Sequence, residues 1–125
     1  MSEQQPTFRT DHRAAGERAA GLAASWCRRR LGRPYAQSAW QMLADAARLG
    51  VIRHGPPEAW AAGSVIALAR VSGLIGAGQP LTAQQVAGDF GVTLGALAVT
   101  ERELARALHL ARYAQRPAAG PTADG

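Results

Sequence analysis

The sequence predicts an all-α fold, a five-helix bundle built around a buried third helix. Apolar residues recur at three- and four-residue steps along several segments, which is the amphipathic pattern of surface helices. Between these segments, residues 58–75 contain no charge after Glu58 except Arg70. A helix that is apolar on all sides belongs inside a bundle or a membrane. Because Arg70 and small polar residues interrupt this stretch before it reaches the ~20 apolar residues of a membrane span, we predict a central helix and no membrane contact.

The composition is that of one globular domain in a reducing compartment. The chain has 125 residues, 47% of them hydrophobic, which allows a single domain at residues 13–113 between flexible tails at 1–12 and 114–125. The single cysteine, Cys27, excludes an intramolecular disulfide, and the polar start lacks a signal peptide, so a cytoplasmic location is expected. All the basic residues are arginine, which with abundant alanine and glycine suggests a bacterium. The net charge of +5 resides in residues 1–56, where we expect an anionic partner to bind.

The first two helices are predicted from their apolar stripes and from the residues that end them. The first should run from about residue 13 to 31 and stop at Gly32 and Pro34. The second should run from about residue 35 to 49 and end at Gly50 in a left-handed conformation. The tryptophans fall on apolar stripes and are predicted to be core anchors: Trp26, Trp40 and Trp60.

The third helix is predicted to be the centre of the bundle. It should cover residues 59–75, with the other four helices around it, and a glycine-rich loop that includes Pro80 should follow. Arg70 is nearly the only charge on this helix, and a buried guanidinium without a partner is costly. We therefore expect Arg70 to pair with one of three acids and so to join the third and fifth helices: Asp89, Glu101 or Glu103.

The fourth and fifth helices are predicted from their caps. A capping box over residues 82–85 opens a short helix at 83–90, which Gly91 breaks. Thr93 then caps a fifth helix that should continue to about residue 113. A short helix, a glycine turn and a longer helix together predict a helix-turn-helix shape.

A helix-turn-helix would place the start of the fifth helix in the major groove of DNA. The side chains available there, Leu94, Ala98 and Val99, cannot make the paired hydrogen bonds that distinguish bases. Thr100 and Arg102 could contact the DNA backbone. An apolar start of the fifth helix is more typical of a protein-binding surface or a buried contact than of a helix that reads bases.

A run of arginines at the end of the first helix is the sharpest local feature. Three adjacent residues cannot share one face of a helix, so these arginines should fan around its end, joined by Arg33. Guanidinium groups in that arrangement suit phosphate contacts. The alternative is a solvated helix terminus favoured by the helix dipole. The candidate nucleic-acid-binding residues are Arg28, Arg29, Arg30 and Arg33, with Arg13 and Arg18 as further candidates.

Catalytic and metal-binding patterns are lacking, so we expect no enzyme activity, no cofactor and no metal. There is no carboxylate pair and no phosphate-cradling glycine loop after a strand. Cys27 has no evident His–Asp companion and is expected in the core, although its arginine neighbours would lower its pKa if it were exposed. The histidines are far apart and lack metal-ligand spacing: His12, His54 and His109.

The chain from about residue 13 to 113 resembles the cyclin box, and more closely one core repeat of transcription factor IIB, with the clearest match at residues 57–92. The matching steps are Ala61-Ala62, Leu68-Ala69-Arg70, Pro80-Leu81-Thr82, Val86-Ala87 and Gly91-Val92-Thr93. The resemblance implies a five-helix cyclin-like bundle that binds DNA, polymerase or partner proteins without catalysis. This chain differs in having one repeat rather than two, so it could dimerise. It also has acids at positions 101 and 103 where the family tends to be apolar.

Three functions follow from these patterns. The leading hypothesis is a non-enzymatic, DNA-associated, transcription-type domain that contacts phosphates through its arginine cluster. The alternative is a protein-interaction adaptor that uses the apolar start of the fifth helix and its groove with the third. The third is a thiol-dependent activity at Cys27.

Overall fold

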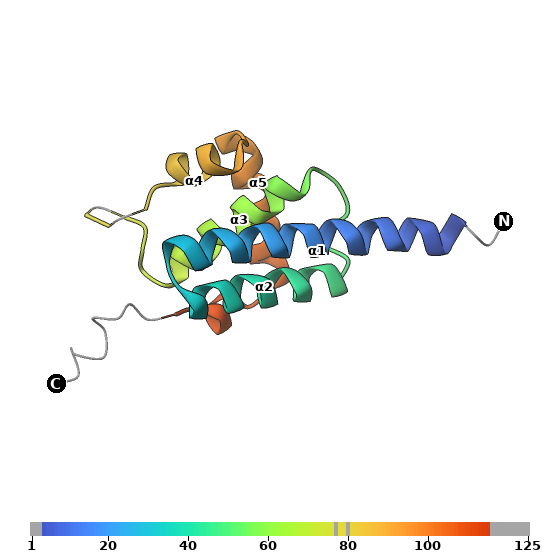
Figure 1. Ribbon diagram of the computed structural model, residues 1–125, viewed down its shortest axis with the longest axis horizontal. Helices are drawn as coiled ribbons and strands as arrows, with labels where there is room; N and C mark the ends of the chain where they lie inside the picture. The colour runs from blue at the N-terminus through green and yellow to red at the C-terminus, as the bar shows by residue number, and fades with distance from the viewer. Residues whose placement is uncertain (1–3, 77, 80, 116–125) are drawn as a thin grey trace.

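The computed structural model describes residues 4–76, 78–79 and 81–115, with side chains from residue 13 onward. The prediction of an all-α fold is confirmed for this part of the chain (Figure 1). Its only β contact there is an isolated bridge between Ile75 and Leu81. The elements are α1 (Gln4–Arg30), α2 (Arg33–Arg48), α3 (Pro57–Val71), α4 (Ala83–Phe90), α5 (Leu94–Ala107) and a 3-10 helix, η1 (Leu110–Tyr113).

Helix α3 lies at the centre of the molecule, as predicted. Every residue from 59 to 69 is buried, and α3 contacts α1, α2, α4, α5 and η1. In Figure 1, α1 and α2 run antiparallel on one side of α3, and α4 and α5 lie on another. The helix ends at Val71 rather than at residue 75, because Gly73 turns the chain with a φ of 77°. The Leu74 amide then donates to the carbonyl of Ala69 at 2.8 Å, which closes the helix end.

A close approach of α3 and α5 fixes the second half of the bundle. A Cβ atom placed on Gly63 would lie 2.1 Å from Thr100 Oγ1 and 2.9 Å from the Glu101 amide nitrogen. Thr100 Oγ1 donates to the carbonyl of Ala59 at 2.7 Å across the same contact. At its edge, Arg70 Nε donates to Glu101 Oε2 at 2.7 Å, so the predicted pairing of Arg70 is confirmed with Glu101.

The first two helices begin earlier than the sequence indicates. Helix α1 starts at Gln4, so residues 4–12, predicted to belong to a flexible tail, are helical. Helix α2 starts at Arg33, and Pro34 lies in its first turn instead of separating two helices. Proline is compatible with that position because the amide it lacks would have no partner there. The reversal between the helices is made by Gly32, whose φ is 115°.

The bounds of the fourth helix and the threonine caps on either side of it follow the prediction, but only the Thr82 half of the predicted capping box is formed among the described residues. Helix α4 covers Ala83–Phe90, and Thr82 Oγ1 accepts a hydrogen bond from the Gln85 amide at 3.1 Å. Gly91 ends the helix in the left-handed region with a φ of 70°. Thr93 Oγ1 then accepts from the Ala96 amide at 3.0 Å and opens α5. Local side-chain chemistry therefore determines this turn.

The prediction of one fifth helix up to residue 113 is wrong. Helix α5 ends at Ala107, and the chain passes through an extended Leu108 into η1. Tyr113 is buried there, and its hydroxyl donates to Asp45 Oδ2 at 2.6 Å. Gln115, predicted to be in the C-terminal tail, is held by hydrogen bonds to Ser72 and Ser38. The rest of that tail, the start of the N-terminal tail and Pro80 lie outside the described residues.

None of the helices in the described part of the chain is both long enough and apolar enough to cross a bilayer.

Candidate nucleic-acid interface

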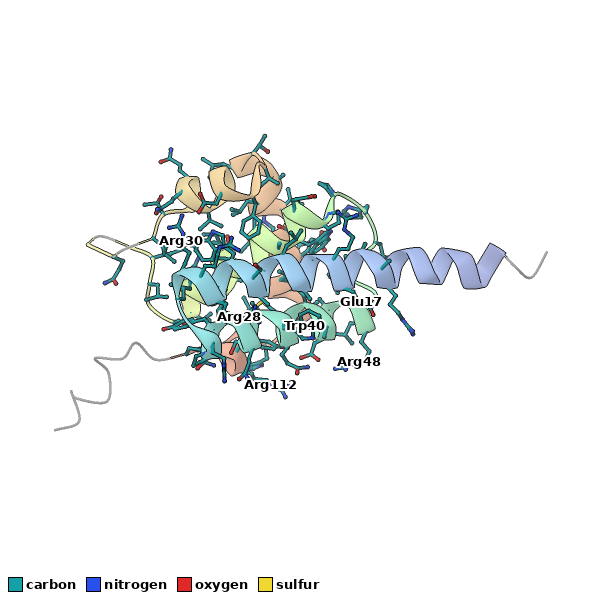
Figure 2. All side chains as sticks on the ribbon, in the orientation of Figure 1. Glu17, Arg28, Arg30, Trp40, Arg48 and Arg112 are labelled. Carbon is teal, nitrogen blue, oxygen red and sulfur yellow. The ribbon has the colours of Figure 1, made fainter. Side chains whose placement is uncertain are left out.

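Trp40 lies on the open face formed by α1 and α2 and not in the core, where it was predicted (Figure 2). Its side chain is 46% exposed, whereas Ala39 and Leu43 on the same helix are fully buried. Because successive helical residues are ~100° apart around the axis, burying Ala39 and Leu43 turns Trp40 to the edge of the interface. The indole reaches across to α1 at Gly21, where an added Cβ atom would lie 4.0 Å from Trp40 Cζ3.

Two hollows meet at Trp40 and form one groove along α1 and α2, which we call the α1–α2 groove. The first has a volume of about 650 Å³ and the second about 670 Å³, and Trp40 lines both. The α1 residues along the groove recur at three- and four-residue steps from 13 to 28, so they form one stripe of that helix. The groove therefore extends along most of the contact between the two helices.

Arginines lie at both ends of the α1–α2 groove. Arg28 and Arg33 line the first hollow, and Arg13 and Arg53 line the second. No ion pair involves these four within the described part of the chain. Two further charges line the second hollow: the acid Glu17, and Arg48, which is paired with Asp45 on α2. The groove thus carries a clear excess of positive charge around a partly exposed indole.

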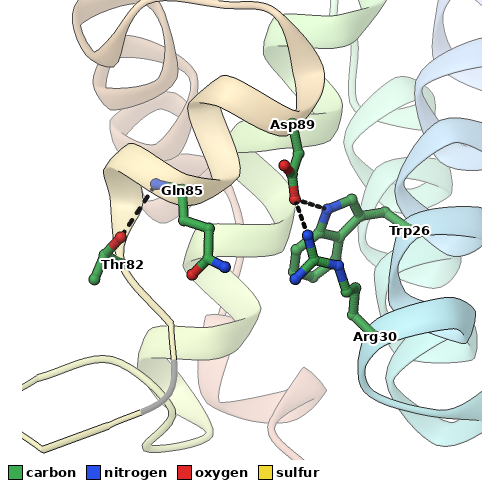
Figure 3. Close-up of polar contacts among 5 residues, drawn as sticks. All are labelled: Trp26, Arg30, Thr82, Gln85 and Asp89. Carbon is green, nitrogen blue, oxygen red and sulfur yellow. Dashed lines mark hydrogen bonds and ion pairs between the residues drawn. The ribbon is translucent and has the colours of Figure 1, made fainter.

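The predicted arginine cluster is divided by the structure. Arg30 points away from the groove and pairs with Asp89 of α4 at 2.6 Å (Figure 3). It also lies 5.3 Å from the ring centre of Trp26, whose Nε1 donates to the same carboxylate at 2.9 Å. Arg30 therefore joins α1 to α4. Arg29 is exposed and donates to Ser25 on its own helix.

The remaining predicted contacts do not join the groove. Arg18 and Arg102 are exposed but line neither hollow. Thr100 was predicted to touch a DNA backbone, and this is wrong because its side chain is 5% exposed and bonded to α3. The apolar start of α5 is on the surface, as required by the adaptor hypothesis: Leu94, Ala98 and Val99 are exposed. A groove between α5 and α3 is closed where Gly63 meets Thr100.

Cys27 is a core residue, as predicted. Its side chain is fully buried, and burial raises the pKa of its thiol from 9.0 to about 12. The nearby arginines point outward and do not lower it. A thiol nucleophile needs an accessible thiolate, so the burial and the raised pKa argue against the thiol-dependent hypothesis. Among the described residues, no group of His, Cys, Asp and Glu side chains could hold a metal ion.

The buried thiol predicts a loss of stability at alkaline pH. Its folded-state pKa lies above the ordinary value, so its contribution to stability is complete below pH 9.0 and is lost as the pH rises toward about 12. Burial and the hydrogen bond to Asp45 also raise the pKa of Tyr113, from 10.0 to about 12, so Tyr113 adds a second loss above pH 10.0. Urea unfolding of the wild type and of Cys27→Ala should be compared across this pH range. The free energy of unfolding of the wild type should begin to fall near pH 9.0, and Cys27→Ala should lack this first decrease. Equal pH dependence in both proteins would contradict this.

Sequence reasoning missed Trp40 as a surface residue and Arg53 as part of a site. The sequence did contain a sign that Trp40 is exposed, because Gln37 and Gln41 flank it on α2, and both line the groove with it. Polar residues at i−3 and i+1 indicate that a helical position lies at the boundary of the apolar stripe. No pattern in the sequence pointed to Arg53, which lies in the connection between α2 and α3.

Comparison with known proteins assigns the chain to no family. No protein-family model matches the sequence, and neither a curated protein nor a solved structure matches it at a significant level. The chemistry of the α1–α2 groove is therefore the basis for assigning a function.

Proposed function

We propose that the protein is a non-enzymatic, DNA-associated helical domain that holds a phosphate backbone in the α1–α2 groove. The observation that carries this proposal is the gathering of Arg13, Arg28, Arg33 and Arg53 along one groove without acidic partners in the described part of the chain. Guanidinium groups pair with phosphate through two parallel hydrogen bonds. A net charge of +5 also draws a polyanion toward the protein.

Binding of this kind depends little on base sequence. Phosphate contacts position a nucleic acid, whereas sequence is read through hydrogen bonds to base edges. The exposed side chains at the start of α5, Leu94, Ala98 and Val99, offer no such hydrogen bonds. The helix-turn-helix shape of α4 and α5 therefore adds no base reading in this proposal.

The fold proposal is a single cyclin-like repeat of the type found in transcription factor IIB. Support comes from the buried α3, contacted by the other helices, and from the capped turn at Gly91 between α4 and α5. In that family such repeats dock on DNA and on partner proteins. A lone repeat could complete its binding surface by dimerisation.

Phosphate binding is tested with one double variant that carries both Arg28→Ala and Arg33→Ala. Affinity for a short DNA should fall by roughly tenfold at moderate salt, because two charge-assisted contacts are removed. The slope of log affinity against log salt should become shallower by about two. Fluorescence anisotropy over a salt series measures both quantities, and thermal unfolding should show little change because both side chains are exposed.

The control is Arg102→Ala with Arg106→Ala, which removes the same charge from the exposed face of α5. This control should lower affinity only slightly, through the net charge. If both double variants weaken binding equally, the α1–α2 groove is not the site. Affinity that does not change with salt would contradict phosphate contacts altogether.

The second candidate function is a protein-interaction adaptor, favoured by exposed apolar side chains at the start of α5. Leu94 and Val99 are 44% and 45% exposed. If this surface binds a protein, including a second copy of the chain, then Leu94→Asp or Val99→Asp should abolish that association and leave any DNA binding intact. Sedimentation measurements of the wild type and both variants would detect self-association. A monomer that also binds DNA through α5 would contradict this candidate.

A further inference from the structure

Trp40 differs from the other tryptophans in where its indole lies. Trp26 and Trp60 are 3% and 1% exposed, and each donates Nε1 to a protein oxygen. Trp40 is 46% exposed, and no such bond of its indole is present among the described residues. A large aromatic ring gains stability when its faces are buried. The Trp40 indole is only half buried by the protein, so its exposed part remains available to a ligand in the middle of the charged groove.

The position of the indole between arginines indicates what kind of ligand fits. Along the α1–α2 groove, Arg28 and Arg33 lie on one side of Trp40, and Arg13 and Arg53 lie on the other. The α1 stripe from residue 13 to 28 spans about 22 Å, which is long enough for several successive phosphates of one strand. A chain of phosphates along this path would carry a base over the indole.

A duplex cannot use this arrangement fully, because its base faces are covered by neighbouring bases and only the edges are open. A single strand presents free base faces, and stacking on an aromatic side chain strengthens binding by about 5- to 150-fold per base. Each hollow, at about 650 and about 670 Å³, has the size of pockets that hold small ligands.

We propose that the α1–α2 groove binds single-stranded nucleic acid, with phosphates on the arginines and an unpaired base stacked on the Trp40 indole. This rests on the proposed function and specifies its ligand. Trp40 contributes affinity without base preference, since every base has a π-face. A strand should therefore bind more tightly than the same sequence in a duplex.

The experiment compares three fluorescently labelled ligands of about ten nucleotides: a single strand, its duplex and a strand of abasic sugar-phosphate. The wild type should bind the single strand about tenfold or more tightly than either of the others. Trp40→Leu should weaken single-strand binding by about 5- to 150-fold and leave the abasic strand unchanged. Trp40→Phe, which keeps an aromatic face, should retain most of the affinity.

A second readout uses the tryptophans themselves. Base stacking should quench the emission of Trp40, while the buried Trp26 and Trp60 keep theirs. The quenching should be present in the wild type and absent in Trp40→Phe, which also shows that the effect does not come from unfolding. Circular dichroism of each variant confirms the helical content.

The outcomes separate the two proposals. If the duplex and the abasic strand bind as tightly as the single strand, and Trp40→Leu changes nothing, then stacking is overturned, while loss of binding in the Arg28 and Arg33 variant still supports phosphate contacts. If no nucleic acid binds, the proposed function fails as well. A polyglutamate of equal charge that competes as well as the single strand would also overturn stacking, because it would show that negative charge alone accounts for the binding.

Discussion

Gly63→Ala is expected to lower the free energy of unfolding by about 3 kcal/mol, because overpacking at a tight helix contact forces backbone shifts. The new Cβ atom would lie 2.1 Å from Thr100 Oγ1 and 2.9 Å from the amide nitrogen of Glu101. The hydroxyl can rotate, but the amide nitrogen belongs to the α5 backbone, so the helices must separate. Separation would also stretch the hydrogen bond from Thr100 to Ala59. Urea unfolding followed by circular dichroism measures the change.

Gly88→Ala is the matched control for this substitution. Gly88 is also within a helix, α4, but an added Cβ atom there meets nothing within 4 Å. Alanine has a higher helix propensity than glycine, so Gly88→Ala should raise the free energy of unfolding by about 0.5–1 kcal/mol. The same chemical change is therefore expected to have opposite signs at the two sites. If Gly63→Ala were as stable as the wild type, α3 and α5 could not be in the contact described.

The sequence was sufficient to predict the structural features that depend on a few adjacent residues. Thr82 and Thr93 accept the expected amide hydrogen bonds, Gly91 ends the fourth helix as expected, and Gly50 has the expected left-handed conformation. The burial of residues 59–69 was also predictable, because an apolar helix without a polar face has no stable place outside the core. In each case the information lies within about one or two turns of helix.

Features that depend on distant partners were not predictable. Nothing near residue 108 ends a helix, and η1 forms because Tyr113 reaches Asp45, which is 68 residues away in the sequence. Thr100 was placed on the surface because the close approach of Gly63 was not evident from the pattern. Tertiary contacts override helix propensity in such places.

The candidate site was predictable in part, for the same reason. Arg28 and Arg33 were among the arginines selected, and they do line one hollow. The sequence could not distinguish Arg30 from these two arginines, because the difference lies in its ion pair with Asp89, which is on α4. The connection that brings Arg53 to the second hollow is likewise a property of the folded chain.

Trp60→Ala is expected to lower the free energy of unfolding by about 4 kcal/mol, whereas Trp40→Ala should cost only about 1–2 kcal/mol. Trp60 is 1% exposed, so its removal leaves a cavity beside α3. It also removes the hydrogen bond from its Nε1 to the carbonyl of His54 at 2.7 Å, which ties the connection between α2 and α3 to the core. Trp40 is already 46% exposed, so truncation creates no closed cavity.

Thermal and urea unfolding of Trp60→Ala and Trp40→Ala side by side tests this difference. The two residues occupy apolar stripes that look alike in the sequence, so unequal costs would show that the orientation of α2, and not residue type, decides which indole is structural. Equal costs would place Trp40 in the core and remove the open indole from the α1–α2 groove. A small cost for Trp40→Ala would instead mean that any loss of nucleic-acid binding in Trp40 variants reflects a lost contact with the ligand, because the fold remains intact.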